Sequence, residues 1–231
     1  MMEKKNELTL DKIYHASYVL KEVIRKTEMI YAPELNDNCE VYLKTENLQV
    51  TGSFKVRGAY YKISQLSEEE RAHGVVASSA GNHAQGVACA AQRLNTKAVI
   101  VMPTNANPVK LAGVKAFGGE VELVGTLSSQ REARAQQLVE EAGMVNVHPY
   151  ADPYVAAGQG TIGLEILDQL ESPDAVVVPI GGGGLISGVA YAIKHLNPKV
   201  KVYGVQAAGS ASMIASQQEG APITLDQADT F

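Results

Sequence analysis

The sequence has few cysteines. Only Cys39 and Cys89 occur among 231 residues, and they form no C-x-x-C pattern and have no histidine partner. Two such thiols make a poor metal site. We therefore expect both to be buried, reduced thiols of an intracellular protein.

The sequence also lacks basic clusters and long apolar segments. The formal net charge is -5, the pI is near 5.6, and no basic run extends past Lys4-Lys5, whereas nucleic-acid binding needs a clustered basic surface. The stretch from Met1 to Asn6 is charged and polar, no apolar signal segment follows it, and no apolar stretch could span a bilayer. We expect a cytoplasmic protein that binds neither nucleic acid nor a membrane.

Strand and helix patterns alternate along most of the chain. This alternation predicts an α/β fold, in which parallel strands lie under helices on both faces. The uniformly apolar stretch 175–180 predicts a strand buried on both faces, and Thr9 is the expected N-cap of the first helix. Strands are predicted at 41–43, 74–77, 98–102, 120–124, 175–180 and 200–205, and helices at 8–26, 82–94, 108–117, 128–142, 163–170 and 184–195.

Four consecutive glycines, Gly181 to Gly184, follow the strand at 175–180 and open a helix. Glycine in a regular element costs about 0.5–1 kcal/mol relative to alanine, so a run of four needs a reason. A tight, flexible turn is one reason. A phosphate site is the better one, because bare backbone N–H groups converge at a helix N-terminus. The sequence lacks G-x-x-x-x-G-K-[ST], which disfavours a Walker-type nucleotide site.

Lys55 lies at the start of an apolar helix, next to Phe54 and two residues before Arg57. A partly apolar pocket and a neighbouring cation both lower the pKa of a lysine, as a Schiff-base lysine requires. Taken alone, Lys55 and Arg57 would each be interpreted as a solvated surface residue.

The stretch Ser79-Ala80-Gly81-Asn82-His83 joins a strand to a helix through small and polar residues. Ser79 or Asn82 could be a simple N-cap, and His83 a surface histidine. Alternatively, the loop is a second anion site. Its N–H groups and hydroxyl would then hold a carboxylate, while the Asn82 amide donates to a cofactor oxygen.

Together these segments resemble those of the fold-type II pyridoxal-phosphate enzymes. Ser53-Phe54-Lys55, the stretch from Ser79 to Gly86 and the glycine run occur in the same order and at similar spacing as in that family, with further similarity at 41–49 and 158–165. The similarity is closest to the threonine dehydratases (threonine ammonia-lyases), particularly the short catabolic form, and covers nearly all 231 residues.

The resemblance implies an α/β fold like that of tryptophan synthase β, with two open, twisted, mostly parallel sheets flanked by helices. Residues 1–67 and 151–231 would form a larger cofactor-binding domain, and residues 68–150 a smaller domain with the substrate loop. Family members continue past Phe231, so we expect the larger domain to be incomplete at its C-terminus. They also form dimers or tetramers, which implies a homo-oligomer.

The resemblance also implies roles for single residues. Lys55 would hold pyridoxal 5'-phosphate as a Schiff base and act as the catalytic base. The implied reaction is the dehydration and deamination of L-threonine to 2-oxobutanoate and ammonia, with L-serine to pyruvate as a secondary activity, as used in threonine catabolism and isoleucine biosynthesis. The other cofactor contacts would be Phe54, Asn82, Gly181, Gly182, Gly183, Gly184 and Leu185, and the substrate carboxylate would meet Ser79, Ala80, Gly81, Asn82 and His83.

Ala80 discriminates within the family. Serine racemases carry a serine at this position as a second proton donor. Alanine has no proton to give, which favours elimination over racemisation. Racemases also carry acidic metal ligands after the strand at 200–205, where the stretch from Gln206 to Ser212 has no carboxylate. We therefore predict no divalent metal site there.

Three alternatives stay open at this point. They are a serine racemase, a β-replacing enzyme such as a cysteine synthase, and a non-catalytic or catalytically incomplete module. The form of the loop from Ser79 to Gly86 disfavours the second. The presence of Lys55 disfavours the third, whereas ring contacts expected beyond Phe231 favour it.

Overall fold

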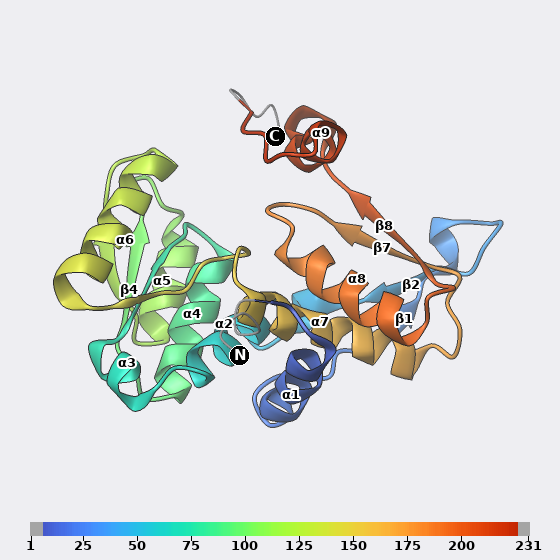
Figure 1. The fold of residues 1–231 in the computed structure, drawn as a ribbon, viewed down its shortest axis with the longest axis horizontal. Helices are drawn as coiled ribbons and strands as arrows, with labels where there is room; N and C mark the ends of the chain where they lie inside the picture. The colour runs from blue at the N-terminus through green and yellow to red at the C-terminus, as the bar shows by residue number, and fades with distance from the viewer. Residues whose placement is uncertain (1–6, 226–231) are drawn as a thin grey trace.

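The computed structural model describes residues 7–225. The predictions for residues 1–6 and 226–231 lie outside the described residues. No helix in the described part is both long and apolar enough to cross a membrane. In Figure 1 the chain forms two groups of elements, one around β4 and one around α7 and α8, with α2 between them.

The larger sheet consists of four parallel strands in the order β5-β4-β3-β6. Successive side chains face opposite sides, so Val75 and Ala77 join the core under α2, α4 and α5, while Val76 and Val99 pack against α6. The predicted helices on both faces are therefore present. The elements are β3 (Val75–Ser78), β4 (Ala98–Met102), β5 (Glu120–Leu123), β6 (Val145–Asn146), α2 (Lys55–Ser64), α4 (Asn82–Arg93), α5 (Pro108–Ala116) and α6 (Ser128–Ala142).

The rest of the described chain carries two two-stranded sheets. β1 (Met29–Tyr31) pairs antiparallel with β2 (Tyr42–Lys44), and β7 (Ala175–Pro179) pairs parallel with β8 (Lys201–Val205). The predicted α/β class, with parallel sheets flanked by helices, is confirmed. The division into domains at 1–67 with 151–231 and at 68–150 stays a prediction. The remaining helices are α1 (Leu10–Leu20), α3 (Glu68–His73), α7 (Pro153–Gln169), α8 (Gly184–Leu196) and α9 (Ser212–Glu219), with 3-10 turns that include η3 (Glu46–Leu48) and η4 (Ala208–Ser210).

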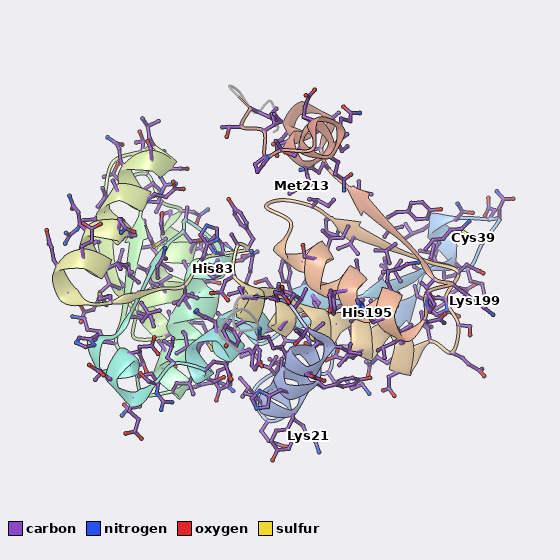
Figure 2. All side chains as sticks on the ribbon, viewed as in Figure 1. Lys21, Cys39, His83, His195, Lys199 and Met213 are labelled. Atoms are coloured by element: carbon purple, nitrogen blue, oxygen red, sulfur yellow. The ribbon has the colours of Figure 1, made fainter. Side chains whose placement is uncertain are left out.

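Several expectations about single elements were wrong. The strand at 175–180 is not buried on both faces, because α7 and α8 cover only the side that carries Val178, and Val177 is 65% exposed. Cys39 is exposed in the loop between β1 and β2 (Figure 2), so only Cys89 is a buried thiol. The first helix does begin after the predicted N-cap, whose hydroxyl accepts from the Lys12 N–H, but it ends at Leu20.

Helix α7 starts earlier than the sequence pattern indicated, at Pro153. The Asp152 carboxylate accepts hydrogen bonds from the N–H groups of Tyr154 and Val155 and so caps the helix. The early part of α7 was missed because Gly158 and Gly160 have low helix propensity. Their function is close packing: a Cβ on Gly158 would lie 2.6 Å from the Cα of Gly58 in α2. The backbones of α7 and α2 therefore touch, which fixes α2 near the centre of the molecule.

A buried ion cluster, formed by Lys44, Glu46, Arg57 and Glu165, fastens α2 to β2, η3 and α7. Arg57 has no exposed surface, and its guanidinium binds both carboxylates in bidentate fashion at 2.6–3.0 Å. Its Nη1 also donates to the Thr161 hydroxyl at 3.1 Å. Burial disfavours a charged Glu46, but the bonds from Arg57 hold its pKa below the ordinary value. Two carboxylates and two cations therefore balance within the cluster.

The substitution Arg57→Met should be strongly destabilising. It leaves Glu46 and Glu165 buried without their main counter-charge, which costs about 3–5 kcal/mol of unfolding free energy. Urea unfolding measures this loss. A matched control is Arg134→Met, because Arg134 also binds one glutamate, Glu122, through two nitrogens but at the surface. A loss no larger than that of the control would contradict the structural role of Arg57.

Candidate active site

Lys55 is the first residue of α2, and its side chain is half-buried. The amine donates a hydrogen bond of 2.9 Å to the carbonyl of Pro149 and lies 5.3 Å from the centre of the Phe54 ring. Burial lowers the pKa of Lys55 below its ordinary value of 10.5. Arg57, the neighbouring cation expected to lower this pKa, is instead paired with Glu46 and Glu165.

A connector between β6 and α7, residues Val147 to Ala151, brings the predicted segments together. The Val147 carbonyl accepts from the His83 ring at 2.7 Å, and the next carbonyl but one, of Pro149, accepts from Lys55. Tyr150 lies against the glycine run, since a Cβ on Gly182 would fall 2.2 Å from its ring. The connector thus links the lysine, the α4 loop and the glycines.

Sequence reasoning missed this connector because it has neither a helix nor a strand pattern. One signal was available. The connector follows β6, a strand of the parallel sheet, and ligands of such sheets bind outside the carboxyl ends of the strands. A loop at that edge is therefore a candidate for contact with a ligand.

The glycine run connects β7 to α8 with an open backbone. Gly183 has φ +90°, a conformation that favours glycine, and it caps α8. A Cβ on Gly181 would meet nothing within 4 Å, whereas a Cβ on Gly182 or Gly184 would meet Tyr150. The first N–H groups of α8 have no partner inside the helix. Leu185 packs into the cluster between α7, α8 and β7. This loop fits a phosphate group.

The loop from Ser79 to Asn82 connects β3 to α4. Neither expected side-chain cap forms, because Gly81 is the N-cap residue and the Ser79 hydroxyl instead accepts from the Gly81 N–H at 3.3 Å. Ala80 and Asn82 are exposed, and Asn82 accepts a hydrogen bond from Lys110. In the described part of the chain, Ser79, Ala80 and Asn82 make no hydrogen bond to Lys55 or to the glycine run.

His83, which Figure 2 labels in the group of elements around β4, is buried rather than a surface residue, with 3% of its surface exposed. Burial, with smaller contributions from the charges of Lys55 and His148, lowers its pKa to about 4. The imidazole is therefore neutral. Because its Nε2 faces the Val147 carbonyl, the proton is on Nε2 and Nδ1 is a bare acceptor. Its side chain cannot donate to a carboxylate, so only its backbone N–H suits the role predicted for His83.

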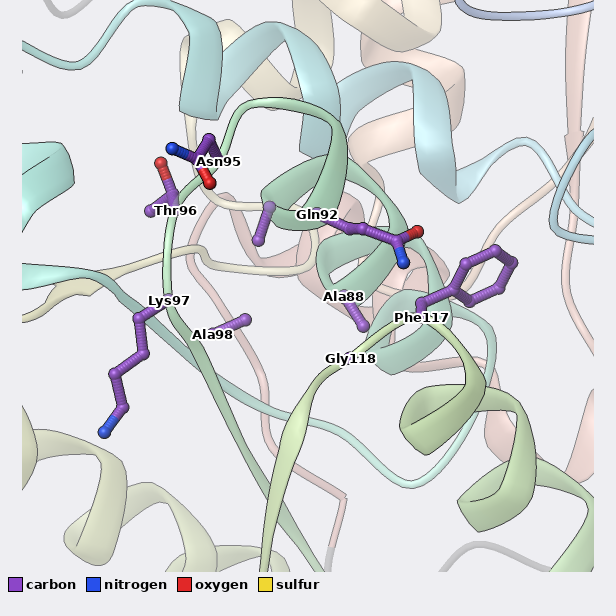
Figure 3. A pocket seen from close by; sticks show the side chains of 9 residues that line it. Ala88, Gln92, Asn95, Thr96, Lys97, Ala98, Phe117 and Gly118 are labelled. Carbon is purple, nitrogen blue, oxygen red and sulfur yellow. The ribbon is translucent and has the colours of Figure 1, made fainter.

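A pocket of about 290 Å³ lies away from these segments, at the carboxyl end of α4 (Figure 3). Asn82 begins α4, and the helix rise places it about 9 Å from Ala88, the first residue of α4 that lines this pocket. None of the predicted site residues lines it. The lining residues include Ala88, Gln92, Asn95, Thr96, Lys97 and Phe117.

No three His, Cys, Asp or Glu side chains gather into a possible metal site within residues 7–225. In the stretch after β8, the Gln206 side chain instead accepts from the N–H groups of Met213 and Ile214 at the start of α9. The expected absence of a divalent metal there stays a prediction.

Replacing Lys55 by methionine should stabilise the cofactor-free protein most at neutral pH. The folded state disfavours the charged amine, so the wild type carries a full penalty below its lowered pKa. That penalty disappears as the pH rises through 10.5, where the unfolded chain also loses the proton. Urea unfolding of both proteins, at about pH 7 and at about pH 10.5, should show the advantage shrinking. Lys115→Met, at an exposed position of α5, is the control; a pH-independent advantage of Lys55→Met would contradict the burial effect.

The chain is similar to several known proteins. A curated relative, the L-threonine ammonia-lyase of Thermotoga maritima, is 53% identical over 215 residues, which are 92% of this chain and 54% of the relative. This chain thus spans about half the length of that relative. The solved threonine deaminase isoform 2 of Solanum lycopersicum has a TM-score of 0.90 at 42% identity, with 98% of this chain and 64% of that chain covered.

A solved structure of maize serine racemase has a TM-score of 0.93 to this chain at 35% sequence identity. The alignment covers 96% of this chain and 68% of the racemase chain. The family model for pyridoxal-phosphate dependent enzymes matches residues 20–231. This match shows that the chain, with its half-buried lysine, its glycine loop and the connector between them, belongs to the family of pyridoxal-phosphate dependent enzymes.

Proposed function

We propose that the protein is a threonine ammonia-lyase, which converts L-threonine to 2-oxobutanoate and ammonia and acts on L-serine as a secondary substrate. One observation carries the proposal. The Lys55 amine, with its lowered pKa, is held by Pro149 next to Tyr150, which contacts the glycine loop. The 53% identity to a relative named L-threonine ammonia-lyase supports the choice of substrate. A cytoplasmic location and a dimeric or tetrameric assembly belong to the same proposal and rest on the family resemblance.

Different residues of the chain bind the cofactor phosphate, the cofactor ring and the substrate carboxylate. The backbone N–H groups from Gly181 to Gly184 hold the cofactor phosphate, with Leu185 packed behind them, and Phe54 packs near the ring. The Asn82 amide donates to the ring oxygen. The substrate carboxylate binds at Ser79 and at the backbone N–H groups of the α4 start, including that of His83.

Lys55 is the proton carrier of the proposed reaction. When bound, pyridoxal phosphate supplies an electron sink for the α-carbon of an amino acid. A lysine with a lowered pKa has more of the neutral amine at working pH, and this amine accepts the proton from the substrate α-carbon. The substrate then loses its β-hydroxyl as water and later regains one water. The net products are therefore one 2-oxo acid and one ammonia per substrate.

A serine racemase is the second candidate, and the TM-score of 0.93 to the maize enzyme favours it. Racemisation requires a proton donor on the face of the substrate opposite to Lys55. Ala80, at the exposed tip of the α4 loop, has no such proton. We therefore propose elimination as the main reaction.

The test is product formation from L-threonine in the presence of pyridoxal phosphate. We expect 2-oxobutanoate, and we expect Lys55→Ala to lower the rate about 10³-fold or more, because it removes the acid–base group. Lys115→Ala is the control. The assay is run on the purified protein.

Two results would contradict the proposal. One is a purified, folded protein that releases no 2-oxo acid from threonine or serine. The other is full activity in Lys55→Ala. Formation of D-serine from L-serine at a rate above that of pyruvate would instead favour the racemase.

A further inference from the structure

Helices α4 and α5 contact each other at two places, which lie one turn apart on each helix. Both follow strands of the parallel sheet and share one core with it, so they run in the same direction. A Cβ on Gly113 would fall 2.2 Å from the side-chain nitrogen of Gln85, so Gly113 leaves room for that side chain. One turn earlier on each helix, the Lys110 amine donates to the Asn82 side-chain oxygen at 2.6 Å.

The contact with Lys110 determines which way the Asn82 amide faces. A lysine amine has three hydrogen-bond donors and no acceptor. It can therefore bind only Oδ1 of Asn82, and the Nδ2 group turns away from it. Among the described residues Nδ2 donates to no protein atom. Asn82 is the first residue of α4, where the backbone N–H groups have no partner inside the helix.

We propose that Lys110 is a positioning residue, which fixes the Asn82 amide so that its NH₂ group faces the ring oxygen of the cofactor. This inference rests on the role of Asn82 in the proposed function. Lys110 itself touches neither cofactor nor substrate. Without it the amide rotates, and in part of the molecules its carbonyl oxygen opposes the ring oxygen, which is an unfavourable contact between two acceptors.

The first measurement is the dissociation constant of pyridoxal phosphate, obtained by equilibrium dialysis with each purified variant. Lys110→Met should bind about tenfold more weakly, the equivalent of one hydrogen bond. Lys110→Arg keeps a donor and should restore binding. Lys110→Glu should bind more weakly than Lys110→Met, because a carboxylate accepts from Nδ2 and turns the amide the wrong way. Lys115→Met removes a charge from the same helix without touching Asn82, and should bind as the wild type does.

A double-mutant cycle separates orientation from charge. If Lys110 acts through Asn82, then Lys110→Met should add no further loss in an Asn82→Ala background. An equal loss in both backgrounds would show a general charge effect and would overturn the inference. The pH midpoint of the visible absorption band is a second readout. Lys110→Met and Asn82→Ala should shift it in the same direction, because both remove the donor to the ring oxygen.

The outcomes distinguish this inference from the function on which it rests. If Lys110→Met binds cofactor like the wild type while Asn82→Ala binds it weakly, Lys110 has no positioning role and the role of Asn82 is kept. If Asn82→Ala also binds like the wild type, the role of Asn82 in the proposed site fails, and the inference fails with it. Urea unfolding of each variant confirms that it is folded.

Discussion

The bidentate pairing of Arg57 with Glu46 and Glu165 is the interaction on which the site depends. It lies two residues after Lys55 and ties the first turn of α2 to η3 and α7. The close approach of Gly58 to Gly158 adds a backbone contact between α2 and α7 at the next residue. The lysine therefore projects from a helix end that is held by ion pairs and by backbone packing. A reactive group that must stay within hydrogen-bond reach of its ligand needs a rigid point of attachment.

The connector from Val147 to Ala151 brings the other segments of the candidate site to this fixed helix. It offers one carbonyl to His83 and another to Lys55, and it lays Tyr150 against the glycine loop. Segments that are far apart in sequence thus meet through five residues. His83 is neutral in this arrangement mainly because it is buried, and the nearby charges of Lys55 and His148 act in the same direction.

The sequence was sufficient for features that depend on local pattern. The strand at 98–102 and the helix at 128–142 occur with the predicted bounds, because alternation and helical periodicity are strong there. The sequence alone could not predict features that depend on partners far away along the chain. The burial of Arg57 requires carboxylates 11 and 108 residues away. The glycines of α7 weaken a helix locally, and their benefit arises only from the approach of α2. The roles of Lys55, Asn82 and the glycine run stay predictions.

The claim that Lys55 is the cofactor lysine can be tested directly by chemical mapping. The chain is incubated with limiting pyridoxal phosphate, reduced with borohydride and digested, and the modified lysine is located by mass spectrometry. We predict that the label lies on Lys55, because its amine is held by Pro149 and has a lowered pKa. A label distributed over surface lysines such as Lys97 and Lys199, with Lys55 unmodified, would contradict the account.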